Sequence, residues 1–126
     1  MTEHRDRIDD LASRAQADRK AFDPPENPPD EERALSILRS GVGEVIGVYV
    51  EGRTGEFARF DEWEMEQLEQ ALNDWLALYA RCYGYEIETE FTVREVAELV
   101  IKTHDIHDTV QLLTHVPTPE VRRTRV

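Results

Sequence analysis

A long amphipathic helix is the clearest element that the pattern of apolar and polar residues predicts. Over Asp61–Gly84 the apolar side chains recur at helical spacing and fall on one face that is broader than a coiled-coil seam. They are Met65, Leu68, Leu72, Trp75, Leu76, Tyr79, Cys82 and Tyr83. Asp61 and Glu64 have the spacing of a capping box, and Gly84 is the residue type that best ends a helix. We therefore expect the other elements to pack around this helix.

Two shorter helices are predicted after it. Tyr85–Phe91 alternates between less polar and acidic residues, which predicts a short strand or an extended connection with one wet face. Thr92 and Glu95 then form a second capping box. A break at Thr103–Asp105 separates this helix from a last one that ends near Thr114. The inward side chains are expected to be Val93, Val96, Ala97 and Val100 in the first helix and Ile106, Val110 and Leu113 in the second.

The stretch Asp30–Arg53 supports two interpretations. Apolar residues at helical spacing after a cap-like Asp30 favour a helix, which is the interpretation we adopt. Gly41, Gly43 and Gly47 each disfavour a helix by about 1 kcal/mol. The β-branched residues that follow leave a small β-hairpin over residues 45–60 as the alternative.

Together these elements predict an all-α domain, a bundle of four to five helices. Residues 1–22 are expected to form an accessory helix, because their apolar stripe is thin and needs something to dock on. Residues 23–29 contain four of the six prolines and are expected to form a stiff linker. Residues 30–117 are then the helical core, and residues 118–126 are expected to be a mobile tail.

The charge composition indicates the solvent in which the protein works and says little about its fold. The chain has 27 acids and 15 bases, a net charge of −12, and only two of the bases are Lys. Residues 61–90 hold nine acids and one base. An acidic, Lys-poor surface is what we expect of a protein in molar salt, where charge repulsion is screened. A patch for a basic partner is the alternative, and DNA binding is not excluded by this composition.

Compartment follows from what the sequence lacks. The single Cys82 rules out an internal disulfide framework. The N-terminus is charged and has no apolar run, and the least polar stretch, Gly41–Val50, is too short to span a membrane. We therefore expect a cytoplasmic protein.

A pattern resembling a helix-turn-helix covers residues 92–115. A capped first helix, a break and a second helix are the elements of a DNA-associated regulator. The second helix begins with Asp105 and Asp108 and has no Lys or Arg to contact a phosphate or a base edge. DNA binding through this segment is therefore an alternative and not the leading prediction.

Metal binding is the other chemical alternative. His104 and His107, with His115 and Cys82 farther off, are residue types that bind zinc. If the preceding helix runs through His104, that side chain lies on the apolar face and the two histidines diverge. No spacing among the four residues matches a known ligand pattern, and no phosphate-binding loop or activated nucleophile is present. We expect no cofactor and favour a chain that is not an enzyme, with a metal-dependent enzyme as an alternative.

Trp63 is the candidate interface residue. It points away from the main apolar face of its helix and lies among Gln67, Gln70 and Arg81. An exposed Trp is a common anchor at protein interfaces. The opposing interpretation is that the first helix or the linker packs over it.

Two strings carry a resemblance to a known family. The segments ALNDWLALYARCYG and FTVREVAELVIKTHDIHDTVQLLTHVP resemble a small family of uncharacterised haloarchaeal proteins, over about Asp30–Pro117. The resemblance implies a high-salt cytoplasm and transfers no catalytic or binding residue. By elimination, the leading functional prediction is a non-enzymatic module that binds a protein partner or another copy of itself.

Overall fold

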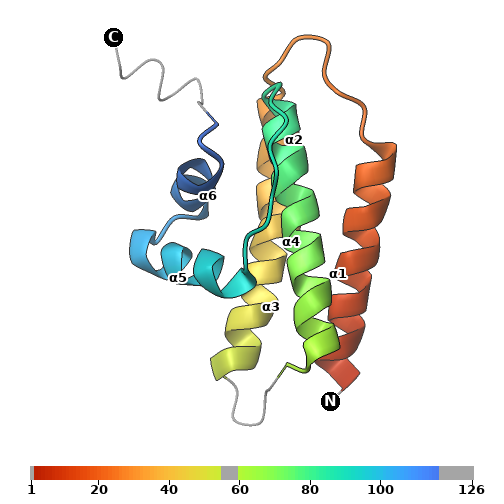
Figure 1. Ribbon diagram of the computed structural model, residues 1–126, viewed down its shortest axis with the longest axis vertical. Helices are drawn as coiled ribbons and strands as arrows, with labels where there is room; N and C mark the ends of the chain where they lie inside the picture. The colour runs from red at the N-terminus through yellow and green to blue at the C-terminus, as the bar shows by residue number, and fades with distance from the viewer. Residues whose placement is uncertain (1, 55–59, 117–126) are drawn as a thin grey trace.

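The computed structural model describes residues 2–54 and 60–116 and shows an all-helical bundle, as predicted (Figure 1). A π-helical turn, η1 (Leu38–Val42), joins α2 to α3, so these elements form one continuous rod and the described chain contains five rods. The helices are α1 (Thr2–Ala21), α2 (Glu31–Ile37), α3 (Gly43–Thr54), α4 (Glu62–Cys82), α5 (Val93–Thr103) and α6 (Ile106–Thr114).

Helix α4 is the centre of the bundle and contacts every other helix (Figure 1). Its capping box is confirmed, since Asp61 Oδ1 accepts from the Glu64 amide at 2.7 Å and Glu64 Oε1 accepts from the Asp61 amide at 2.9 Å. Its buried face is wider than the predicted one. The added buried residues are Glu64, Ala71, Asp74, Leu78 and Ala80. Asp74, one of these residues, pairs with Arg19 of α1, so α4 is enclosed on more than one side.

Helix α1 runs beside α4 and shares its hydrophobic core (Figure 1). Ile8, Leu11 and Ala15 are buried in the same cluster as the apolar face of α4. Polar contacts reinforce this packing. The Trp75 indole donates to Asp18 Oδ2 at 2.8 Å, and Arg14 Nη2 donates to the Ser40 carbonyl at 3.0 Å. The docking that a thin apolar stripe requires is therefore provided by α4 and its neighbours, so α1 is continuous with the core over residues 30–116.

The proline-rich stretch after α1 is held at both ends. Two guanidinium groups contact the Phe22 ring, with Arg33 Cζ 4.2 Å and Arg81 Cζ 5.0 Å from the centre of the ring. Arg33 Nη1 also donates to the Asp23 carbonyl at 2.7 Å. At the other end, the Asp30 amide donates to the Cys82 carbonyl at 2.8 Å. These contacts join the stretch to α2 and to the end of α4.

The hairpin alternative for residues 45–60 is wrong where the structure describes it. Residues 43–54 are helical, and Phe60 lies in a coil where its ring covers Gly52 and stacks on Tyr49. Residues 55–59, the rest of the hairpin, lie outside the described part. The helix forms because its β-branched residues are buried from several sides, so tertiary packing outweighs their preference for strands.

The glycines in this rod have different environments. A Cβ atom on Gly41 would lie 2.6 Å from the buried Trp75 ring, so only glycine lets η1 approach α4 this closely. A Cβ atom on Gly43 would lie 2.9 Å from the Leu38 carbonyl oxygen, within the π-helical turn. A Cβ atom on Gly47 would meet nothing within 4 Å. Close helix packing therefore explains Gly41 alone.

Residues 85–91 form an extended connection, one of the two predicted possibilities. Asn73 of α4 fastens it, because its Oδ1 accepts from the Phe91 amide at 2.8 Å and its Nδ2 donates to the Phe91 carbonyl at 2.9 Å. The predicted Thr92–Glu95 capping box then starts α5, and His104 separates α5 from α6 in a left-handed conformation with φ 59°.

Candidate functional site

Trp63, the residue predicted for an interface, is half-buried and has a partner inside the chain. The Arg5 guanidinium of α1 lies 4.2 Å from the centre of its ring and also pairs with Asp61 at 3.1 Å. A cation over an indole face is a favourable arrangement. The first helix therefore packs over Trp63 as the opposing interpretation expected, and the ring forms part of the contact between α1 and α4.

The candidate metal ligands do not form one site in the structure. His104 and His115 are exposed, and each ends a helix in the left-handed conformation, with φ 59° and φ 58°. His107 lies in the first turn of α6, and Cys82 is wholly buried in α4. Within the described ranges, no three His, Cys, Asp or Glu side chains come together in a way that could hold a metal ion.

Two buried groups at the end of α4 have altered acidity. Burial raises the pKa of the Cys82 thiol to about 11, although Arg33 opposes the shift. Burial, together with the neighbouring Tyr83, also raises the pKa of Tyr79. The Tyr79 hydroxyl is enclosed in the core without a hydrogen-bond partner among the described residues. Both groups stay protonated at neutral pH, which suits a packed interior rather than a nucleophile.

The segment predicted to resemble a helix-turn-helix does form two helices joined by a tight turn. Thr103 Oγ1 contacts Thr109 Oγ1 at 2.9 Å and donates to the Asp105 carbonyl at 2.9 Å, which fixes the angle between α5 and α6. Asp105 caps α6 by accepting from the Asp108 amide at 3.1 Å. The first turn of α6 therefore presents carboxylates, and they would meet the phosphates of DNA unfavourably.

The same helix pair carries the two most exposed large apolar side chains of the described chain. Ile101 of α5 is 60% exposed and Leu112 of α6 is 58% exposed, while Leu35 and Tyr85 are 39% and 44% exposed. Residues 93–116 also carry only four acids and two bases. We call this pair of helices, with its two exposed aliphatic side chains, the α5–α6 surface.

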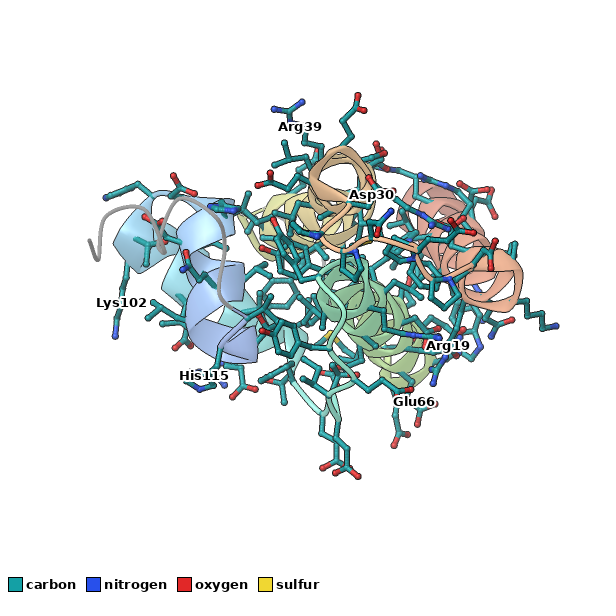
Figure 2. The ribbon with its side chains drawn as sticks, turned by 90° about the horizontal axis from the view of Figure 1, so that it is seen from above. Arg19, Asp30, Arg39, Glu66, Lys102 and His115 are labelled. Carbon is teal, nitrogen blue, oxygen red and sulfur yellow. The ribbon has the colours of Figure 1, made fainter. Side chains whose placement is uncertain are left out.

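A polar cavity lies on another side of α4. It has a volume of about 430 Å³ and is lined by residues of α1, α4 and the extended connection, among them Arg19, Asn73, Asp74, Glu88 and Glu90. Asp74 is buried at its base, and Arg19 Nη1 donates to its Oδ1 at 2.6 Å. Figure 2 shows Arg19 on this side of the bundle. We call this cavity the α4 groove.

Neither the α5–α6 surface nor the α4 groove was predicted from sequence. The only local signal for the groove is that Ala71 and Leu78 extend the apolar arc of α4 toward Asp74. That extension indicates a neighbour on this side. It does not identify Arg19, which is 55 residues away in the chain.

The fold and these surfaces define a small all-α domain built on one central helix. The chain belongs to the family described as domain of unknown function DUF8055, and the match covers residues 2–118. The predicted resemblance to an uncharacterised family is confirmed to that extent, and the match takes in α1 as well as the core. No curated protein and no solved structure matches the chain.

None of the helices in residues 2–54 and 60–116 is both long enough and apolar enough to cross a membrane.

Proposed function

We propose that this chain is a non-enzymatic, self-associating protein-interaction module of a salt-rich haloarchaeal cytoplasm, and that it associates through the α5–α6 surface. The observation that carries the proposal is the exposure of Ile101 and Leu112 on one helix pair of a strongly acidic chain. Large aliphatic side chains exposed singly need no explanation. Here the two most exposed ones of the described chain share a helix pair, and that pair has a smaller excess of acids than residues 61–90.

Charge favours this surface over the acidic residues 61–90 as the place where a second copy would bind. The centres of protein interfaces are depleted of charged residues. Residues 61–90 hold nine acids and one base, so two such surfaces repel each other. The α5–α6 surface carries four acids and two bases, and its carboxylates at Asp105 and Glu95 act as helix caps.

Molar salt would allow the association. At about 1 M salt the Debye length is about 3 Å, so the repulsion between two acidic chains is screened beyond direct contact. Burial of apolar surface is not screened in this way. The proposed contact is therefore suited to the solvent that the composition indicates.

The two alternatives predicted from sequence gain no specific observation. For DNA binding, α6 lacks Lys and Arg and begins with carboxylates. For metal-dependent catalysis, His104 and His115 end separate helices, and Cys82 is enclosed in the core. The self-associating module remains the function that the geometry supports best.

A co-purification experiment tests this proposal. Two copies with different tags are co-expressed and purified through one tag in molar KCl, and the second tag is then probed. We expect the wild-type chain to retain its second copy and the Ile101→Glu/Leu112→Glu variant to lose it, because two charges in an apolar contact oppose burial. Leu35→Glu/Tyr85→Glu is the matched control, since it changes the other two exposed apolar residues. Retention by all variants alike, or by none including wild type, would refute the proposal.

A further inference from the structure

Helix α1 is held in the bundle by a short apolar stripe near its middle. Four of its described side chains are buried, and two of the four are alanines. They are Ile8, Leu11, Ala12 and Ala15. Residues 5–7 and 16–21, on either side of the stripe, are exposed, whereas α4 buries eleven of its 21 residues. A segment with few buried apolar contacts is the kind that opens before the rest of a protein does.

Three exposed ion pairs join the same part of α1 to the rest of the bundle. Each pairs an arginine of α1 with a carboxylate of α3 or of the α4 cap, and the six side chains are 40–60% exposed. They are Arg5–Asp61 at 3.1 Å, Arg7–Glu51 at 3.1 Å and Arg14–Glu44 at 3.5 Å. Exposed pairs of this kind are weakened by salt, and at about 1 M salt the Debye length falls to about 3 Å. The attachment of residues 2–15 therefore depends on ionic strength.

The C-terminal end of α1 is attached in a way that salt affects less. Asp74 is buried, and Arg19 Nη1 donates to its Oδ1 at 2.6 Å. Directly after α1, Arg33 of α2 contacts the Phe22 ring and donates to the Asp23 carbonyl at 2.7 Å. Because buried charges are screened much less than exposed ones, residues 19–23 stay attached under conditions in which residues 2–15 can detach.

The net charge of the chain makes salt act in the opposite direction on the rest of the fold. Residues 2–21 hold five acids and five bases, so the net charge of −12 lies outside α1. Repulsion among the remaining acids opposes folding, and salt relieves it. Rising salt should therefore stabilise the bundle as a whole and, at the same time, loosen the attachment of residues 2–15.

We propose that residues 2–15 of α1 are an arm whose attachment is controlled by ionic strength. As the salt concentration rises, the arm detaches more often from α3 and from the start of α4, and residues 19–23 keep it tethered. Detachment takes the Arg5 guanidinium off the Trp63 ring and so uncovers an aromatic side chain of the bundle. Figure 1 shows α1 at the edge of the bundle with its N-terminus beside the start of α4. The arm contains no residue of the α5–α6 surface, so this proposal and the proposed self-association can fail separately.

Hydrogen exchange followed by mass spectrometry tests the arm on the full chain, with rates expressed relative to those of the unfolded chain in the same salt. Between about 0.3 M and about 3 M KCl, we expect the amides of residues 6–15 to exchange about tenfold faster, because the three exposed pairs are weakened together. The amides of α4 should exchange more slowly over the same range, because salt stabilises the bundle as a whole.

Two variants show whether the arginines are responsible. In Arg5→Gln/Arg7→Gln/Arg14→Gln, the amides of residues 6–15 should exchange fast already at the lower salt concentration and respond little to more salt. The matched control, Arg39→Gln/Arg94→Gln/Lys102→Gln, removes three exposed charges elsewhere and should keep the wild-type response. Slow exchange of α4 in both variants confirms that they are folded.

Three results would overturn the proposal. Exchange of residues 6–15 that slows with salt in step with α4 means that α1 opens only when the whole chain unfolds. An equal acceleration by salt in the Arg5→Gln/Arg7→Gln/Arg14→Gln variant means that the ion pairs do not control the arm. An acceleration that extends equally through residues 16–21 means that the whole helix leaves the bundle and that its end is not anchored.

Discussion

The contact between α1 and α4 and the pair formed by α5 and α6 use the same acidic composition in opposite ways. Along α1 and α4, carboxylates are paired across the contact. Asp18 accepts from Trp75, Asp74 from Arg19, and Asp61 from Arg5. In α5 and α6, carboxylates serve within their own helices, as caps and in the pair of Glu98 with Arg94.

Because of this difference, we expect different residues to control the stability of the chain and its association. The side of α4 that faces α1 and η1 is closed by aromatic packing and by contacts far apart in sequence. Ile101 of α5 and Leu112 of α6 are exposed, without such cover from the described residues. We therefore expect substitutions around α4 to change the free energy of unfolding, and substitutions on the α5–α6 surface to change association.

The largest effect should come from filling the close contact between η1 and α4. Gly41→Ala places a methyl group against the Trp75 ring, which is buried and held by Asp18, so it should lower the free energy of unfolding by about 1–3 kcal/mol. Gly47→Ala is the matched control in open space, and it should raise that free energy by about 0.5–1 kcal/mol. Urea titration in molar KCl measures both. Shifts of the same sign would show that the contact with Trp75 is not tight.

A smaller loss of stability is expected at Asn73, which joins α4 to the connection that leads into α5. Asn73→Ala removes both hydrogen bonds to Phe91 and should cost about 1–2 kcal/mol, less than for a fully buried site because water can replace them. Asn73→Asp keeps the acceptor for the Phe91 amide and loses the donor, so its cost should be intermediate. Urea titration again decides. Equal stability of Asn73→Ala and wild type would mean that the two hydrogen bonds to Phe91 contribute nothing to the free energy of unfolding.

A smaller effect should appear with pH. The folded chain holds the Cys82 proton up to a pKa of about 11, against an ordinary value of 9.0, so the folded state binds more protons between these values. The Cys82 contribution to stability is therefore complete below pH 9 and is lost as the pH rises toward 11, by at most about 1.4 kcal/mol per pH unit. Unfolding free energies measured across this range should fall more steeply for wild type than for Cys82→Ala. Parallel curves would contradict the assigned shift.

Local signals in the sequence predicted most of the fold. The capping boxes at Asp61 and Thr92 are satisfied within four residues, so they can be read from spacing alone, as can the amphipathic face of α4. The close approach of Gly41 to Trp75 could not be predicted, because it joins residues that are far apart in the chain. The break after α5 was predicted. The exposure of the His104 side chain could not be, because His104 ends the helix with a left-handed backbone.

The candidate surfaces were harder to predict for the same physical reason. Trp63 could be placed off the apolar face of its helix, but Arg5, which covers it, is 58 positions away in the chain. Asp74 is one of nine acids in residues 61–90, and its burial depends on Arg19 and the core. The exposure of Ile101 and Leu112 depends on which other helices pack against α5 and α6, and the spacing of residues in the sequence does not show this.

Sedimentation velocity in molar KCl, over a range of protein concentrations, tests the separation of stability from association most directly. We predict that wild type and Leu35→Glu/Tyr85→Glu sediment as a concentration-dependent oligomer and that Ile101→Glu/Leu112→Glu sediments as a monomer. The free energy of unfolding of the monomeric form should stay within about 0.5 kcal/mol of wild type, because both positions are exposed. A wild-type chain that is monomeric at every concentration, or an oligomer that survives Ile101→Glu/Leu112→Glu, would contradict the account.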